Sequence, residues 1–125
     1  MDTKTQSNNG VLIINPPGEL QIGLQALLTT HLDLDVLVVC EIESAFKIIA
    51  TFNPSLIILD QNISKKDPAS IISKMKTTWP AILCLALAND DESQHLLAQA
   101  GADRVLIKGL HGSQLIKEIK DLLDS

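Results

Sequence analysis

Aromatic side chains are scarce in this 125-residue sequence, which contains two Phe, one Trp and no Tyr. Proteins that bind single-stranded nucleic acid without sequence preference stack bases on aromatic rings, so this scarcity argues against that function. The formal net charge of −5 at pH 7 argues the same way, because phosphate backbones attract basic surfaces and repel acidic ones. We therefore expect no direct nucleic-acid binding by this chain as a whole.

Cysteines are also few, and long apolar runs are missing. Cys40 and Cys84 each adjoin a short apolar segment, and neither belongs to a Cys-x-x-Cys pair or a Cys/His cluster that would suggest zinc. We expect two buried free thiols in a reducing compartment. No apolar stretch approaches the roughly 20 residues that cross a bilayer, and no signal peptide is recognisable. These features predict a cytoplasmic protein without membrane contact.

Short aliphatic runs alternate with helical patterns along the chain. Hydrophobic residues make up 46% of the sequence and charged residues 20%, as in folded globular domains. Five runs rich in Val, Ile and Leu have the length of strands covered on both faces: residues 11–14, 36–39, 56–59, 82–87 and 104–107. Apolar residues at helical spacing predict five helices, around residues 20–28, 45–52, 71–79, 96–100 and 115–123.

Strict alternation of strand and helix predicts a parallel sheet with right-handed crossovers and helices on both faces. We expect an α/β fold: a single (βα)5 doubly wound domain over residues 11–125, with the flavodoxin-like strand order 2-1-3-4-5. Residues 1–10 are polar and are expected to form a disordered tail. Asp90 or Asp91 is expected to begin the fourth helix, and Gly101 to end it in a left-handed conformation.

Two polar residues follow predicted strands at the edge where such sheets bind ligands. In open parallel sheets, ligands bind at the carboxyl ends of the strands where the strand order reverses, here between the first and third strands. Asn15 and Asp60 lie at these two strand ends. An acid in the position of Asp60 can cap a turn, pair with a lysine or take part in chemistry.

Several segments together resemble the receiver domain of response regulators in two-component signalling, including the chemotaxis receiver. LIILDQN (56–62) resembles the third-strand motif, and AGADRVLIKG (100–109) resembles the fifth-strand motif of receivers that precede a helix-turn-helix domain. VLIINPPGELQIGLQALL (11–28) is similar to the first strand and helix. The resemblance implies that Asp60 is the candidate phosphoacceptor and that Lys108 contacts the phosphate or pairs with Asp60.

The resemblance also implies partners. Receivers exchange phosphate with a histidine kinase and act on an output domain, and many dimerise or bind partners through the fourth helix, the fifth strand and the fifth helix. In this sequence that surface would include Asp91, Gln94, His95, Arg104 and Lys117.

Four positions depart from the receiver pattern. Asn15 and Pro16 replace the acidic pair that helps to hold Mg²⁺, Ala86 replaces a Thr or Ser, and Val105 replaces an aromatic switch residue. Asp60 is then the only obvious carboxylate, whereas Mg²⁺ requires several oxygen ligands in octahedral geometry. We expect Mg²⁺ binding to be weak or absent, with no metal site and no other cofactor.

Our preferred interpretation is a pseudo-receiver: a non-enzymatic signalling module that binds a partner without ordinary Mg²⁺-dependent phosphorylation and contains an Asp60–Lys108 ion pair. The alternative is a working phosphoacceptor at Asp60, in the N-terminal part of a DNA-binding regulator. A flavodoxin-like cofactor binder is a third interpretation, but the sequence lacks a phosphate-binding loop and stacking aromatics. Lys65 and Lys66, a few residues after Asp60, predict a solvated loop. The other interpretation is that one of the two ammonium groups occupies the space near Asp60 that a metal ion would otherwise fill.

Overall fold

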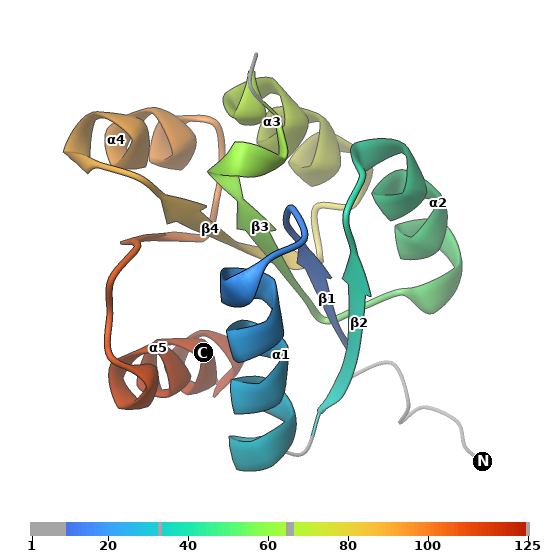
Figure 1. The fold of residues 1–125 in the computed structure, drawn as a ribbon. Coiled ribbons are helices and arrows are strands. Elements are labelled where there is room, and N and C mark those ends of the chain that lie inside the picture. Colours follow the sequence, from blue (N-terminus) through green and yellow to red (C-terminus); the bar gives the residue numbers. More distant parts are fainter. Residues whose placement is uncertain (1–9, 33, 65–66, 125) are drawn as a thin grey trace.

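The computed structural model describes residues 10–32, 34–64 and 67–124, which form one sheet with helices on both faces (Figure 1). All strand pairs are parallel, and the order β2-β1-β3-β4-β5 confirms the prediction. The strands are β1 (Gly10–Ile14), β2 (Asp35–Val39), β3 (Leu56–Asp60), β4 (Leu83–Ala88) and β5 (Arg104–Ile107). The helices are α1 (Glu19–His31), α2 (Ile42–Phe52), the short 3-10 helix η2 (Gln61–Ile63), α3 (Pro68–Thr78), α4 (Asp91–Gln99) and α5 (Gly112–Asp124).

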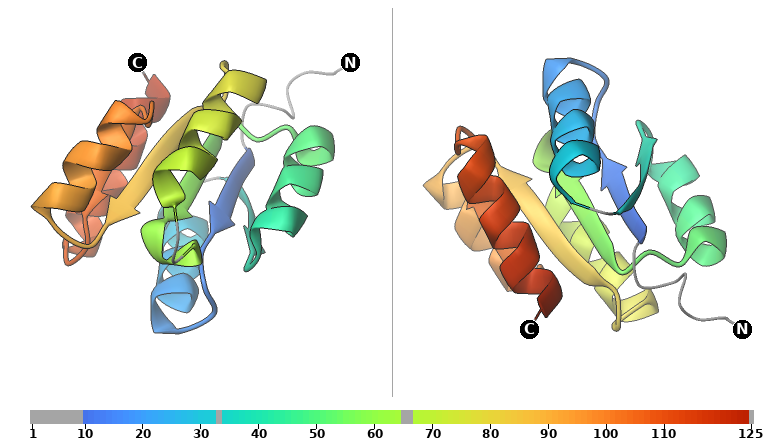
Figure 2. Two further views of the ribbon diagram at one scale, coloured as in Figure 1. Left: turned by 90° about the horizontal axis from the view of Figure 1, so that it is seen from above. Right: turned by 90° about the horizontal axis from the view of Figure 1, so that it is seen from below.

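Alternate residues of the central strands enter two separate cores. In β1, Leu12 and Ile14 pack with residues of α2, α3 and α4, whereas Val11 and Ile13 pack with residues of α1 and α5. Figure 2 shows the two helical layers on opposite faces of the sheet. Burial on both faces explains why β1 and β3 are continuous aliphatic runs in the sequence.

The ends of α4 follow the sequence prediction. Asp90 is the N-cap, and its carboxylate accepts a hydrogen bond from the Ser93 N–H at 2.8 Å. This backbone hydrogen bond stabilises the ionised form and lowers the pKa of Asp90. Gly101 has φ +116°, in the region that favours glycine, and it follows the last turn of α4 as expected.

A lysine links the opposite end of the sheet. Lys76 Nζ, at the end of α3, donates to Asp103 Oδ2 and to the Ile82 carbonyl, both at 2.9 Å. Asp103 Oδ2 also accepts from the Cys84 N–H at 2.8 Å. These contacts join α3, β4 and the turn before β5 at the amino ends of the strands, away from the expected site.

Several expectations from the sequence were wrong in detail. β2 is an edge strand with one strand neighbour; Val36, Val38 and Val39 are only partly buried against the two cores, and Leu37 is 37% exposed. Cys40 lies just beyond β2 and is exposed, whereas Cys84, within central β4, is buried as expected. Leu96 is 51% exposed, because α4 turns the neighbouring Leu97 toward the core. Gly10 belongs to β1 and not to a tail.

Other expectations concern residues that are not described. Residues 1–9, assigned to the tail, and Lys65 and Lys66 lie outside the described residues. In the part of the chain that is described, no helix is both long enough and apolar enough to span a membrane.

The two thiols should differ sharply in reactivity. Burial, followed by the nearby Asp103 carboxylate, raises the pKa of Cys84 to about 12, and only the thiolate reacts with alkylating agents. We expect iodoacetamide at about pH 8, below the ordinary thiol pKa, to modify Cys40 in the native protein and to leave Cys84 unmodified. Peptide mass spectrometry before and after denaturation checks this. Alkylation of both thiols at similar rates in the folded protein would contradict it.

Candidate functional site

The candidate site lies where β3 ends and the chain turns into η2. Asp60, the last residue of β3, is only 3% exposed. The register pairs Ile14 of β1 with Leu59 of β3. The next residues along these two segments, Asn15 and Asp60, therefore lie at the same edge of the sheet. Lys108 directly follows β5, at the same edge of the sheet. The topology therefore brings together the strand ends that the sequence indicated.

The Asp60 carboxylate is paired on one oxygen. Asp60 Oδ1 accepts from Lys108 Nζ at 2.5 Å and from the Asn62 N–H at 2.9 Å. The carboxylate thus caps η2 and also forms the ion pair with Lys108 that the sequence led us to expect. The Asp60 side chain is 4% exposed and that of Lys108 is 23% exposed, so the acid is the more strongly desolvated partner.

Asn89 extends this pair into a network. Lys108 Nζ donates to Asn89 Oδ1 at 2.8 Å. The Asn89 side-chain amide donates to Asn62 Oδ1 at 2.9 Å, and its backbone N–H donates to Gln61 Oε1 at 2.7 Å. The loops after β3, β4 and β5 are therefore linked by side chains. Sequence reasoning missed Gln61, Asn62 and Asn89, although Asn89 follows the fourth predicted strand just as Asp60 ends the third.

The side chain of Asn15 differs from those of its neighbours at this edge, whereas its backbone N–H donates to the Val39 carbonyl at 3.2 Å. Asn15 is 1% exposed. Among the described residues, neither the oxygen nor the nitrogen of its side-chain amide has a hydrogen-bond partner. A buried polar group in this condition costs about 1–3 kcal/mol. Pro16, which follows, is half-buried and has no side-chain ligand.

The residues present do not fit a Mg²⁺ ion. Mg²⁺ binds oxygen ligands, mainly carboxylates, in near-octahedral geometry. Within residues 10–32, 34–64 and 67–124, no three His, Cys, Asp or Glu side chains gather as a metal site. Asp60 is one carboxylate, and one of its oxygens already accepts from an ammonium and an N–H. The neighbouring position is the neutral Asn15, so the site lacks the charge that would repay dehydration of the ion.

Ala86 and Val105, which replace the Thr or Ser and the aromatic residue of receivers, lie side by side on β4 and β5. The register of β4 and β5 pairs these two residues, and both belong to the core that faces α2, α3 and α4. Ala86 is fully buried and has no hydroxyl. Val105 has no ring, and its carbonyl accepts from Gln94 Nε2 of α4 at 3.1 Å. The structure brings these positions near the site without supplying the groups that receivers have there.

Comparison with known proteins agrees with the fold and with the resemblance to receiver domains. The family model of the response regulator receiver domain matches residues 11–120. The chain therefore belongs to the response regulator receiver domain family. A comparison with curated proteins found no significant match.

Solved receiver structures are similar in fold. The BeF3-activated N-terminal receiver domain of Klebsiella pneumoniae RstA is 23% identical with a TM-score of 0.84, over 94% of this chain and 100% of that one. The receiver domain of a DNA-binding response regulator from Colwellia psychrerythraea is 24% identical, with a TM-score of 0.81, over 93% and 98%. A two-component response regulator from Clostridium difficile is 21% identical, with a TM-score of 0.83, over 93% and 96%.

The two halves of the ion pair should contribute unequally to stability. Lys108→Met leaves the buried Asp60 carboxylate without its ammonium, so we expect the free energy of unfolding to fall by about 3 kcal/mol. Asp60→Asn leaves a lysine that reaches water, so we expect a loss of about 1 kcal/mol. Urea unfolding of both variants measures the difference. Equal losses, or a larger loss for Asp60→Asn, would show that the carboxylate does not depend on Lys108.

Proposed function

We propose that this receiver domain regulates a partner protein by binding it, without ordinary Mg²⁺-dependent phosphorylation of Asp60. The observation that carries the proposal is the neutral, buried Asn15 beside Asp60, which leaves Asp60 as the one carboxylate described at this edge, already paired with Lys108. The partner is a histidine kinase or an output domain of a two-component system. The domain acts as a signalling module and catalyses no reaction of its own.

The electrostatics of phosphoryl transfer support this proposal. Negative charge develops on the transferring oxygens, and catalysis consists mainly of positioning and of cations that neutralise this charge. Here one ammonium, Lys108, already neutralises the one carboxylate. An approaching phosphoryl group would bring more negative charge to a site whose only described cation is engaged. Attack by Asp60 is therefore disfavoured.

The readout of a phosphate is also weakened. A ligand shifts a conformational equilibrium only if it interacts differently with the two states. Ala86 offers no hydroxyl to a phosphoryl oxygen, and Val105 has no ring whose position could report the state of the site. A phosphoryl group on Asp60 would thus have little to act on beyond Lys108.

A fixed surface remains for partner binding. On the face formed by α4, β5 and α5, Gln94 donates to the Val105 carbonyl, and Arg104 Nη1 pairs with Glu118 Oε1 at 2.9 Å. A cavity of about 580 Å³ lies on the same face, with Asp91 and His95 among its lining residues. By family analogy we propose this face for a homodimer or a partner protein.

A working phosphoacceptor is the second candidate function. Asp60 and Lys108 are both present at the strand ends and are in contact, which is the observation that favours it. The two functions differ in whether a small phosphodonor modifies the domain.

We expect acetyl phosphate at about 10 mM with Mg²⁺ to leave the mass of the protein unchanged, because the ion lacks ligands and Asp60 is already paired. Intact-protein mass spectrometry measures phosphorylation, and amide chemical shifts with beryllofluoride measure formation of the phosphoryl analogue. The K. pneumoniae RstA receiver, whose structure is BeF3-activated, is the positive control. A phosphoryl group on Asp60 would establish the second candidate function.

Carboxylates introduced at positions 15 and 16 should create a Mg²⁺ site. In Asn15→Asp/Pro16→Asp, two carboxylates join Asp60 at the same edge, and we expect Mg²⁺ to bind with a Kd of about 1 mM or tighter. Calorimetry measures the affinity, and a rise in Tm with Mg²⁺ gives an independent readout because ligands of the native state stabilise it. The single variant Asn15→Asp is the matched control and should respond less. A folded double variant without a Mg²⁺ response would show that something other than the missing acids blocks the site.

A further inference from the structure

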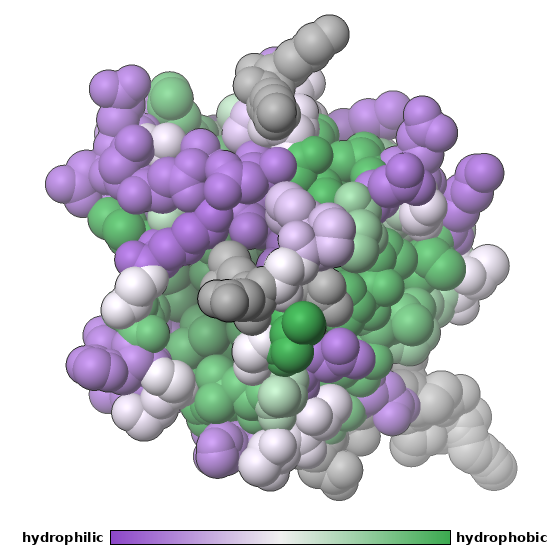
Figure 3. All heavy atoms as spheres, viewed as in Figure 1, coloured by the Kyte–Doolittle hydropathy of each residue, from purple (hydrophilic) through white to green (hydrophobic). Residues whose placement is uncertain are grey.

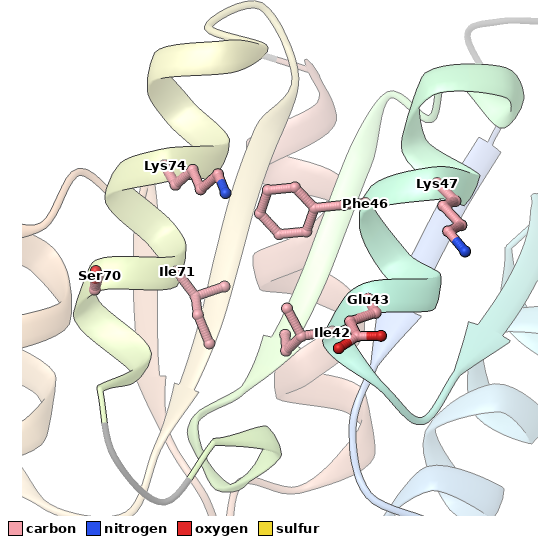
Figure 4. Close-up of a pocket in the computed structure, with 7 residues that line it drawn as sticks. All are labelled: Ile42, Glu43, Phe46, Lys47, Ser70, Ile71 and Lys74. Atoms are coloured by element: carbon pink, nitrogen blue, oxygen red, sulfur yellow. The ribbon is translucent and has the colours of Figure 1, made fainter.

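A groove between α2 and α3 lies apart from the site and from the face formed by α4, β5 and α5. It encloses about 470 Å³. Figure 4 shows side chains of the two helices facing each other across it. On its other side, α3 packs against α4. In Figure 3, hydrophobic surface extends across the region between α3 and α2.

The floor of the groove is apolar and includes an aromatic ring. Ile42 and Phe46 of α2 and Ile71 of α3 are only half-buried. Phe46 packs edge-on against Trp79, with ring centroids 5.6 Å apart, and Lys74 Nζ lies 5.2 Å from the Phe46 ring centroid. Phe46 is thus held in place while part of it faces solvent. Ile42 and Phe46 are four residues apart and pack beside Ala45 and Ile49, so they extend the apolar face of α2 from the core toward the groove.

The charged side chains around the floor differ between the two ends of the groove. Lys47 and Lys74 flank the Phe46 end, one from each helix. Glu43 and Ser70, one turn earlier on the same helices, flank the other end. Two lysines at one end of an apolar groove stand out in a chain of net charge −5. Complementary charge on a ligand at that end would set its orientation and speed its association.

We propose that this groove binds an amphipathic helical segment of a partner protein. The segment has two apolar side chains one turn apart, which cover Ile42, Phe46 and Ile71, and acidic side chains beside Lys47 and Lys74. A helix is the fitting shape because the groove is formed by two helices and offers no free strand edge for backbone pairing. The proposal goes beyond the proposed function, because it does not involve Asp60.

A synthetic helical peptide tests the groove directly. The probe is an end-capped peptide of about 16 residues, long enough for measurable helicity, with Leu at i and i+4, Glu beside them and Ala or Gln elsewhere. We expect a Kd of about 100 µM by fluorescence anisotropy. Amide chemical-shift changes should centre on α2 and α3. A matched peptide with Lys in place of Glu should bind at least about tenfold more weakly, because it meets like charge.

Variants locate the contact. Lys47→Glu/Lys74→Glu should weaken binding of the Glu peptide by about tenfold, since both attractive charges become repulsive. Lys120→Glu reverses a charge in the same way at one exposed position of α5 and should alter the Kd by less than about twofold. Glu43→Gln removes the acid at the groove and should tighten binding about twofold. Circular dichroism of each variant checks the fold.

Four outcomes would overturn the proposal: no binding at about 1 mM peptide, as much weakening by Lys120→Glu as by Lys47→Glu/Lys74→Glu, equal binding of the two peptides, or shift changes confined to α4, β5 and α5. Self-association of the protein alone that is abolished by Lys47→Glu/Lys74→Glu would also overturn it, by identifying a second copy as the occupant. None of these results bears on acetyl phosphate, so failure here is distinguishable from failure of the proposed function.

Discussion

The contact between the Lys108 ammonium and the buried Asp60 carboxylate determines the chemistry of the strand-end edge. A carboxylate this strongly desolvated must be paired, and in this chain one lysine and one backbone N–H provide the pairing. The same ammonium also donates to Asn89, so the charge that neutralises Asp60 links the loop after β4 as well. In a receiver that has several acids at this edge, a metal ion is needed to offset their negative charge. Here the negative charge of Asp60 is offset by the positive charge of Lys108.

The neutral Asn15 follows from the same balance. Two further carboxylates at positions 15 and 16 would crowd negative charge around Asp60, and a single lysine could not offset it without a metal. Asn15 instead leaves a buried amide without a hydrogen-bond partner among the described residues, at a cost of about 1–3 kcal/mol. That cost is smaller than the roughly 3–5 kcal/mol lost when one partner of a buried ion pair is removed. With Asn15, the edge avoids the repulsion among three carboxylates and loses only the hydrogen bonds of one amide.

The sequence was sufficient for the fold and for part of the site. Alternation of aliphatic runs and helical stripes predicted every strand and helix longer than one turn, because periodicity and burial are local properties. Asp60 and Lys108 were predicted to meet because the two segments that contain them resemble the third-strand and fifth-strand motifs of receivers. Asn89 was not predicted to join them, because its role depends on how the loop after β4 places one amide. The exposure of Cys40 and Leu37 was missed because apolar composition does not distinguish an edge strand from a central one.

The proposed lack of a phosphate response has a consequence for how this domain can signal. Moving a two-state equilibrium from 1:99 to 99:1 requires about 5.5 kcal/mol of differential interaction. Lys108, the main described contact of such a phosphoryl group, already pairs with Asp60 and donates to Asn89. Under the proposed function the available difference is small and the population of conformations changes little. Regulation would then depend on which partner occupies the α4–β5–α5 face or the groove between α2 and α3.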